Sequence, residues 1–272
     1  MALDGALFWL RVAFAAAAFV GFWLGAAVLA CTILPIVSLL NRRHGRVKRA
    51  QACQRCVQRA FTWLHDYLRF FALIDFDPRR VRLELPEGGF VVIANHPTLV
   101  DVVALASVFG RLTCVAKASL FRSPILGQIL RACAYVDGGG GDPFAGAMVV
   151  TQGVERVREG LPLLIFPEGT RSPTGDLWAF KKGACEIACR AGVPVLPVVL
   201  TCHPSALERG RPWYDIPRRK ALFTMRALPQ LAPHDFGGDA AAMTRHCESL
   251  FRRELGLAER TKNDLTPATM SS

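Results

Sequence analysis

A histidine and an aspartate five positions apart are the first candidates for chemistry in this sequence. His96 and Asp101 stand in the segment NHPTLVD, directly after the apolar run 90–94. An aspartate that holds one imidazole nitrogen leaves the other nitrogen able to accept a proton, as general base catalysis requires. Positions five apart on a regular helix point about 140° away from each other. Because proline is favoured at the first helical position, Pro97 predicts that His96 lies in the turn before a helix, with Asp101 one turn into it. A histidine that only caps the helix is the alternative.

A second polar turn follows another apolar run. Residues 166–172 read FPEGTRS. A turn that carries glutamate, threonine, arginine and serine suits the binding of anionic oxygens, because arginine binds phosphate through a planar fork of donors. Taken by itself, the segment is more typical of a solvated turn.

The elements around these turns predict the fold. Apolar, strand-like runs stand at 81–85, 90–94, 112–116, 134–136, 163–166 and 195–200, and helix-like segments at 99–109, 124–131, 143–158 and 182–191. This alternation predicts an α/β fold with a mostly parallel sheet flanked by helices. A late strand at 223–227 and a closing helix at 235–255 complete it. Ligand sites in such folds lie at the carboxyl ends of the strands, where both polar turns stand.

The two turns and two further segments resemble the glycerolipid acyltransferases of the lysophosphatidic acid acyltransferase kind. That family shows a His and an Asp separated by four residues, a block with Lys, Leu, Pro and Gly, a Phe-Pro-Glu-Gly-Thr-Arg-Ser block and a Val-Pro-Val-x-Pro stretch. This chain reads NHPTLVD at 95–101, KASLFRSPILGQIL at 117–130, FPEGTRS at 166–172 and VPVLPV at 193–198, in the same order. The resemblance covers about residues 80–230 and implies a glycerol-3-phosphate acyltransferase-like fold.

The resemblance implies a membrane-bound O-acyltransferase. Such an enzyme moves a fatty acyl group from acyl-CoA or acyl carrier protein to the hydroxyl of a lysophospholipid, here most directly 1-acyl-glycerol-3-phosphate, to give phosphatidic acid. It implies His96 as the general base and Asp101 as the residue that orients it, with no metal and no cofactor beyond the thioester co-substrate. The residues that match the family's substrate-binding positions are Glu168, Gly169, Thr170, Arg171, Lys117 and Arg122.

Two departures from the family pattern keep a second acceptor class open. Val136 and Asp137 are followed by four glycines where the family commonly has an arginine, and Pro97 and Thr98 replace a different residue followed by serine. The alternative is therefore an acyltransferase for a non-phosphatidate acceptor, such as an ornithine-type lipid or a lipid of a specialised pathway. A hydrolase is disfavoured because the chain has no Gly-x-Ser-x-Gly elbow. A non-catalytic basic membrane-binding adaptor is the non-enzymatic alternative.

The charge balance favours an anionic partner. Lys and Arg number 33 against 22 Asp and Glu, which suits an acidic membrane surface, an acidic substrate or nucleic acid. The basic residues gather beside the apolar N-terminal segment, so we expect an anionic membrane surface and no nucleic acid. The nine cysteines are scattered and odd in number, which predicts reduced thiols rather than a disulfide framework or a metal site.

The N-terminal segment predicts a membrane anchor. Residues 12–40 carry no formal charge, and a bilayer core of about 30 Å needs only about 20 helical residues. We expect a single-pass or monotopic anchor at 1–40 that Pro35 ends or kinks. The basic cluster at 42–49 places the catalytic domain on the cytoplasmic side. The predicted units are this anchor, a basic amphipathic interfacial helix and linker at 41–80, the acyltransferase α/β domain at 81–230, and a C-terminal helix and flexible tail at 231–272.

Overall fold

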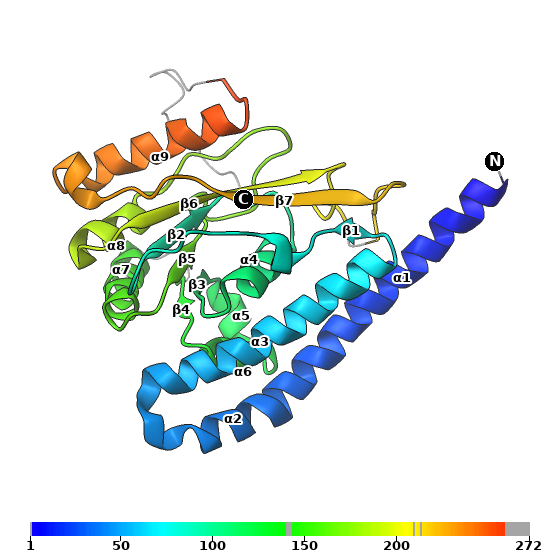
Figure 1. Cartoon of the computed structure of the whole chain (residues 1–272), viewed down its shortest axis with the longest axis horizontal. Coiled ribbons are helices and arrows are strands. Elements are labelled where there is room, and N and C mark those ends of the chain that lie inside the picture. Colours follow the sequence, from blue (N-terminus) through cyan, green and yellow to red (C-terminus); the bar gives the residue numbers. More distant parts are fainter. Residues whose placement is uncertain (1, 140–142, 209, 213, 259–272) are drawn as a thin grey trace.

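The computed structural model describes residues 2–139, 143–208, 210–212 and 214–258. Within these residues the chain forms a seven-stranded sheet of order β1-β7-β6-β2-β5-β3-β4 (Figure 1). Neighbouring strands are parallel except β6 and β7, which are antiparallel. The mostly parallel sheet is confirmed. The strands are β1 (Ile74–Asp75), β2 (Val91–Ala94), β3 (Thr113–Ala116), β4 (Val136–Asp137), β5 (Leu163–Ile165), β6 (Val195–His203) and β7 (Ala221–Ala227).

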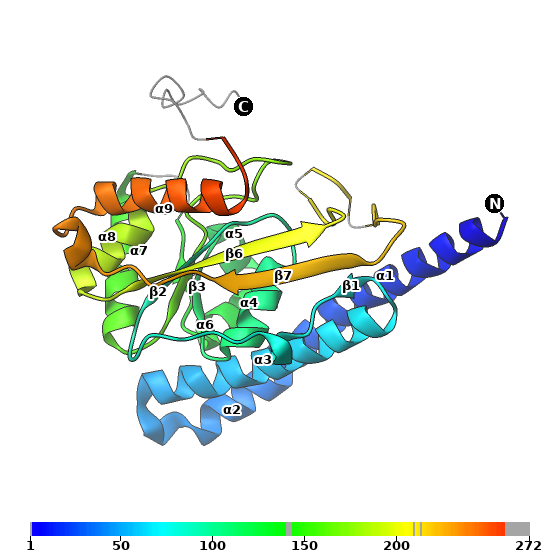
Figure 2. The same ribbon diagram turned by 45° about the horizontal axis from the view of Figure 1, so that its top comes forward.

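Strand β2 lies at the middle of the sheet, and all its side chains are apolar and buried. Val92 and Ala94 join a core under α3 and α4, whereas Val91 and Ile93 join a core under α8 and α9. A parallel strand covered on both faces has no solvent side, and this explains its unbroken apolar sequence. Figures 1 and 2 show the helices in these two layers.

Five helices of the α/β domain follow the prediction, α7 with the predicted ends and the others with shifted ends, whereas α5 was not predicted. They are α4 (Asp101–Phe109), α5 (Ala118–Arg122), α6 (Leu126–Ala132), α7 (Pro143–Arg158), α8 (Gly183–Ala191) and α9 (Ala240–Glu254), with short 3₁₀ helices η2 (Arg42–His44), η3 (Pro78–Arg80) and η4 (Pro233–Phe236). The helix predicted at 124–131 is α6, and it begins after Pro124. From residue 259 on, the tail predicted to be flexible lies outside the described residues.

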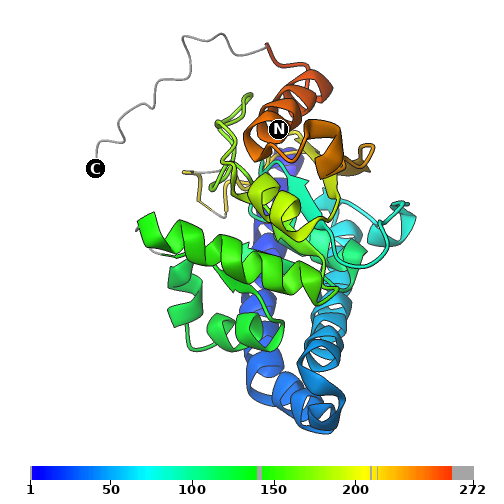
Figure 3. The same cartoon turned by 90° about the vertical axis from the view of Figure 1, so that its left-hand side faces the viewer.

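The N-terminal segment folds back on itself as a helical hairpin. Helix α1 (Ala2–Val28), the π-helical turn η1 (Leu29–Ile33) and α2 (Leu34–Leu40) run one way, and α3 (Gly45–Phe70) returns beside them (Figures 1 and 3). The rings of Phe14 and Phe71 stack with centroids 3.9 Å apart, and the Tyr67 hydroxyl donates to the Phe14 carbonyl at 3.1 Å. The two arms of the hairpin therefore pack on each other, and Phe14, Ala15 and Ala18 of α1 also pack against the core under α3 and α4.

Among the described residues, one helical stretch is long and apolar enough to cross a membrane, Leu7–Leu40. Helix continues through Pro35 to Leu40, so Pro35 does not end it. The irregularity comes before the proline, at the π-helical turn Leu29–Ile33. Proline has no amide hydrogen to donate to the preceding turn, and the wider π-helical turn accommodates this missing hydrogen bond.

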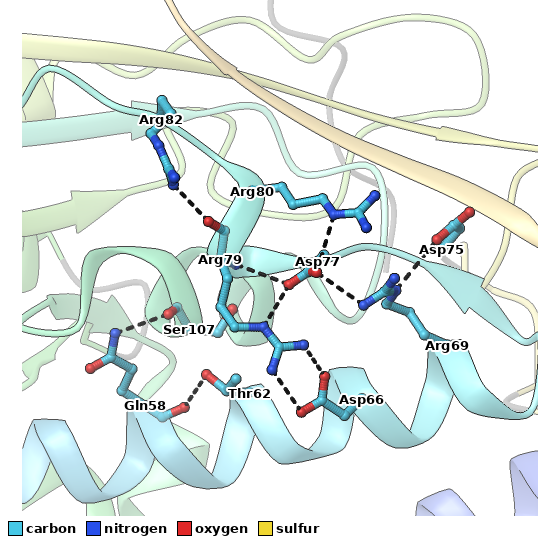
Figure 4. A network of polar contacts seen from close by, with 10 residues as sticks. All are labelled: Gln58, Thr62, Asp66, Arg69, Asp75, Asp77, Arg79, Arg80, Arg82 and Ser107. Atoms are coloured by element: carbon cyan, nitrogen blue, oxygen red, sulfur yellow. Dashed lines mark hydrogen bonds and ion pairs between the residues drawn. The ribbon is translucent and has the colours of Figure 1, made fainter.

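A polar network joins the end of α3 to the start of the sheet (Figure 4). The Arg79 guanidinium binds the carboxylates of Asp66 and Asp77, and Arg69 Nη1 donates to Asp77 Oδ2 at 3.0 Å. These contacts fix the turn at Pro78–Arg80, which leads into the segment 81–85, predicted as a strand. That prediction is wrong, because β1 occupies the sheet edge beside β7 and 81–85 forms no ladder in the described structure.

Candidate active site

His96 stands where β2 leaves the sheet. Backbone pairing of β2 with β6 ends at Ala94 and Val198. The buried side-chain amide of Asn95 then continues the ladder by pairing with the backbone of Leu200, with both hydrogen bonds at 2.8 Å. Asn95 thus fixes the last position of the strand, and His96 is the first residue free to turn toward the carboxyl edge of the sheet.

His96 and Asp101 meet as the spacing predicted. His96 Nδ1 lies 2.7 Å from Asp101 Oδ2, and the Asp101 side chain is fully buried. The backbone amide of Thr98 donates to Asp101 Oδ2 at 2.8 Å, and its hydroxyl donates to Oδ1. Burial raises the pKa of Asp101, while the hydrogen bonds from His96 and Thr98 oppose that rise. Both oxygens of the Asp101 carboxylate are therefore hydrogen-bonded, and Oδ2 faces the imidazole of His96.

The helix that carries Asp101 begins later than predicted. Asp101 is the first residue of α4, with Val100 as its N-cap, so Pro97 does not occupy the first helical position. Thr98, bonded to the Asp101 carboxylate, closes the turn between Pro97 and the helix. A carboxylate at the first helical turn also lies at the favourable end of the helix dipole.

The imidazole of His96 is fixed by an aromatic ring as well as by the carboxylate. The Phe166 ring stacks on it with centroids 4.1 Å apart and an interplanar angle of 20°. The His96 side chain keeps 17% of its surface exposed. Since Nδ1 faces Asp101, Nε2 is the nitrogen placed to exchange a proton with a bound hydroxyl.

Glu168 links the two sequence motifs. Its side chain is 3% exposed, and Oε1 accepts hydrogen bonds from the His96 backbone amide at 3.1 Å and the Ser172 hydroxyl at 2.6 Å. Oε2 accepts from the Trp178 amide at 2.9 Å. Burial raises the pKa of Glu168, and these donors counteract the rise. The carboxylate predicted to bind the acceptor thus has three protein donors.

Arg171 also makes contacts within the protein. Its Nη1 donates to the carbonyls of Leu207 and Glu208, both at 3.0 Å. Leu207 in turn accepts from the Leu99 amide at 3.2 Å. Arg171 therefore braces a loop after β6 against the turn that carries His96 and Asp101. Thr170, next to it, is half-buried.

The candidates of the second block lie on the neighbouring strand and helix. Lys117 is exposed directly after β3, and Arg122 is exposed at the end of α5. Strands β2, β5 and β3 are adjacent and parallel, so Lys117 stands at the same sheet edge as His96, two strand spacings or about 10 Å away. Arg122 is one short helix further along.

Sequence reasoning missed several residues of this site. Phe166 belongs both to the predicted strand 163–166 and to the motif FPEGTRS, but the sequence did not predict that its ring stacks on His96. Lys181 was not considered, yet its ammonium lies over Gly169. A motif gives the order of neighbouring residues along the chain. It does not show that a lysine twelve positions after Gly169 packs over that glycine.

Comparison with known proteins agrees with this geometry. Residues 78–201 match the family model described as Acyltransferase. A 1-acyl-sn-glycerol-3-phosphate acyltransferase of Chlamydomonas reinhardtii is 32% identical over 162 residues, which cover 60% of this chain and 49% of that protein. The human 1-acyl-sn-glycerol-3-phosphate acyltransferase beta is 33% identical over 181 residues, 65% of this chain and 63% of that protein. The matches thus span about half to two thirds of the length of these relatives.

The fold has a solved counterpart. The crystal structure of the 1-acyl-sn-glycerophosphate acyltransferase PlsC of Thermotoga maritima superposes with a TM-score of 0.65 at 22% identity, and covers 95% of this chain and 98% of that one. The shared fold includes a mostly parallel sheet with flanking helices. Residues 78–201, in which the histidine and aspartate of the first motif are in contact, thus match the acyltransferase family.

Proposed function

We propose that this protein transfers a fatty acyl group from a thioester, acyl-CoA or acyl carrier protein, to the hydroxyl of a lysophospholipid. The observation that carries the proposal is the 2.7 Å contact between His96 Nδ1 and Asp101 Oδ2, which leaves Nε2 as the proton acceptor. The favoured acceptor is 1-acyl-glycerol-3-phosphate, and the product is phosphatidic acid. The names of the relatives from Chlamydomonas, human and Pseudomonas aeruginosa support this acceptor.

The reaction needs one base and no covalent intermediate. Asp101 keeps a hydrogen on Nδ1 of His96, so Nε2 carries the lone pair. Nε2 takes the proton of the acceptor hydroxyl as its oxygen attacks the thioester carbonyl carbon. The ester C–O bond forms, the C–S bond breaks, and the imidazolium returns its proton to the leaving thiolate. His96 ends neutral, and the Asp101 carboxylate stabilises the imidazolium between the two transfers.

The N-terminal hairpin is proposed to attach the enzyme to one face of an anionic bilayer, with the catalytic domain on the cytoplasmic side. Large apolar side chains such as Leu24 and Leu40 are 64% and 71% exposed on the hairpin. Arg11 Nη1 donates to the Ala72 carbonyl, so α1 is bonded to the α/β domain. Phe14, Ala15 and Ala18 of α1 also pack against the core of that domain, so these residues cannot enter hydrocarbon unless the domain's polar backbone enters with them. A monotopic anchor is therefore favoured over a single pass.

The direct test is product formation by the full-length protein in lipid nanodiscs. Labelled palmitoyl-CoA and palmitoyl acyl carrier protein would each be offered with lysophosphatidic acid, monoacylglycerol and a lyso-ornithine lipid, and the products identified by mass spectrometry. We expect phosphatidic acid. Product only from the ornithine lipid would replace the acceptor in this proposal, and no product from any pair would contradict enzymatic function.

Variants of the catalytic pair test the mechanism. His96→Ala is expected to abolish turnover while leaving the thermal unfolding midpoint nearly unchanged, because His96 is partly exposed. Asp101→Asn should lower turnover by about three to four orders of magnitude, as it favours the wrong imidazole tautomer. More than a tenth of wild-type turnover in His96→Ala would exclude His96 as the base.

A further inference from the structure

We propose that Lys181 binds a phosphate group of a substrate at the edge of the active site. The inference rests on the acyl transfer proposed above and adds a residue to its binding site. A lysine ammonium contributes a compact positive charge with three donors, which suits phosphate oxygens. The phosphate belongs either to the lysophospholipid acceptor or to the donor, as part of coenzyme A or of the phosphopantetheine arm of acyl carrier protein.

The first observation is the path of the Lys181 side chain. A β-carbon built on Gly169 would lie 2.8 Å from Lys181 Nζ, 3.1 Å from Cε and 3.5 Å from Cδ. The lysine arm therefore runs along the α-carbon of Gly169 and ends over it. Gly169 has a φ of +72°, so this position favours glycine for its backbone as well as for the space that the lysine fills.

The backbone under Lys181 is held at two successive residues. The Lys181 amide donates to the Pro167 carbonyl at 2.8 Å, and the Phe180 amide donates to Glu248 Oε2 at 2.8 Å. The Phe180 ring packs on Phe251 with centroids 5.4 Å apart. These contacts place the start of the lysine arm beside the turn rather than leaving it to swing in solvent.

The turn that Lys181 covers is bonded directly to the catalytic histidine. Glu168 Oε1 accepts from the His96 amide at 3.1 Å, and the Ser172 amide donates to the His96 carbonyl at 2.7 Å. Gly169 lies between these two anchors in the sequence. The backbone of Lys181 is thus bonded to the same turn as His96, and this places its ammonium near the base, as positioning of a substrate anion requires.

The charges around the turn leave this ammonium available. Lys181 is exposed and takes part in no ion pair among the residues that the structure describes. The Glu168 carboxylate is buried and already accepts three hydrogen bonds. Arg171 commits Nη1 to two backbone carbonyls. Lys181 is therefore the better candidate for an anion than either charged residue of the motif.

The experiment compares Lys181→Gln with the matched control Lys182→Gln, whose lysine is exposed one position further on at the N-cap of α8. Steady-state KM and kcat would be measured for lysophosphatidic acid and for monoacylglycerol, with palmitoyl-CoA and with palmitoyl N-acetylcysteamine, a thioester without phosphate. Lys181→Gln should raise KM about 5- to 20-fold for the phosphate-bearing substrate that it contacts, with kcat nearly unchanged. Lys181→Arg should recover most of this loss, and Lys182→Gln should behave as wild type.

The substrate pairs identify the phosphate. A KM increase for lysophosphatidic acid and none for monoacylglycerol assigns the contact to the acceptor. A KM increase for palmitoyl-CoA and none for palmitoyl N-acetylcysteamine assigns it to the donor. Equal losses on all substrates, or none, overturn the proposal. Ligand-observed NMR of glycerol 3-phosphate and of coenzyme A would measure their binding to each variant, and so tests the contact without turnover. A chain that is inactive on every substrate contradicts the proposed function, while the NMR comparison of the same variants still decides the role of Lys181.

Discussion

The Glu168 carboxylate accepts a hydrogen bond from the backbone amide of His96, at 3.1 Å from nitrogen to oxygen. The two residues come from different motifs, and the contact joins the turn after β5 to the turn after β2. The strands are parallel neighbours, so the two turns share one sheet edge. The acidic residue of the second motif thus fixes the position of the His96 backbone.

Glu168→Gln should lower kcat about tenfold with little change in the KM of either substrate. A glutamine has one acceptor oxygen, so it cannot serve the donors of His96, Ser172 and Trp178 together, and a loss of about 1.4 kcal/mol corresponds to a factor of ten. Steady-state kinetics on saturating acceptor would measure it. Glu186→Gln, at a half-buried position on α8, is the control. A change confined to the acceptor KM would instead make Glu168 a substrate ligand.

Arg171→Ala should reduce kcat/KM about tenfold on acceptors with and without phosphate alike. Its Nη1 supports the carbonyls of Leu207 and Glu208, and Leu207 in turn holds the Leu99 amide, so its loss loosens the turn of the catalytic pair. Arg171→Lys should restore part of the activity. Kinetics on lysophosphatidic acid and monoacylglycerol check this, and a loss on the first alone would identify Arg171 as a phosphate ligand.

His65 should make the protein sensitive to mild acid. It is 1% exposed on α3, packs on Phe76, and burial lowers its pKa to about 4 from 6.5. Because the folded pKa lies below the unfolded one, the unfolded chain binds the proton more tightly. Stability is therefore complete above about pH 6.5 and falls as the pH drops toward 4, by up to about 3 kcal/mol.

The variant His65→Phe should flatten this acid loss, since it keeps a ring of similar size without the titrating group. Thermal unfolding midpoints in detergent at pH 7 and pH 4.5 would measure the difference between wild type and variant. His234→Gln is the control, because His234 is exposed on η4. An unchanged pH dependence in His65→Phe would show that other groups cause the acid loss.

The double variant Leu24→Glu with Leu40→Glu should release the protein from anionic vesicles. Both side chains are exposed on the hairpin. Each glutamate removes an apolar contact with the lipid and is repelled by the anionic headgroups. Vesicle flotation in high salt would measure binding. Met148→Glu, an exposed apolar position on α7, is the control. Full flotation of the double variant would place the membrane contact elsewhere.

The sequence predicted the centre of the fold better than its edges. Strands β2, β5 and β6 read as continuous apolar runs because both faces are covered, and the polar turns stand at their ends. The two-residue strand β1 carries no such pattern, and the segment at 81–85 imitated a strand without a partner. Short edge strands are determined by their neighbours rather than by their own residues.

The sequence predicted which residues form the candidate site, but it did not predict the hydrogen bonds that hold them. The spacing of His96 and Asp101 indicated a pair, but that Thr98 rather than Pro97 closes the turn depends on side-chain hydrogen bonds. The apolar sequence of α1 did not reveal that one of its faces packs on α3, because lipid and protein cores select the same residues.

The π-helical turn Leu29–Ile33 sets the rotational phase between the two halves of the N-terminal helix. An extra residue in one turn shifts the following side chains by about 100° around the axis. With it, Phe14 on one side and the buried Leu34 on the other both face the rest of the protein. Deleting one residue there would leave an unbroken, equally apolar helix, yet would turn Arg11 and Phe14 away from Ala72 and Phe71. The hydropathy of this segment and its docking are therefore independent properties, and a change invisible in one can abolish the other.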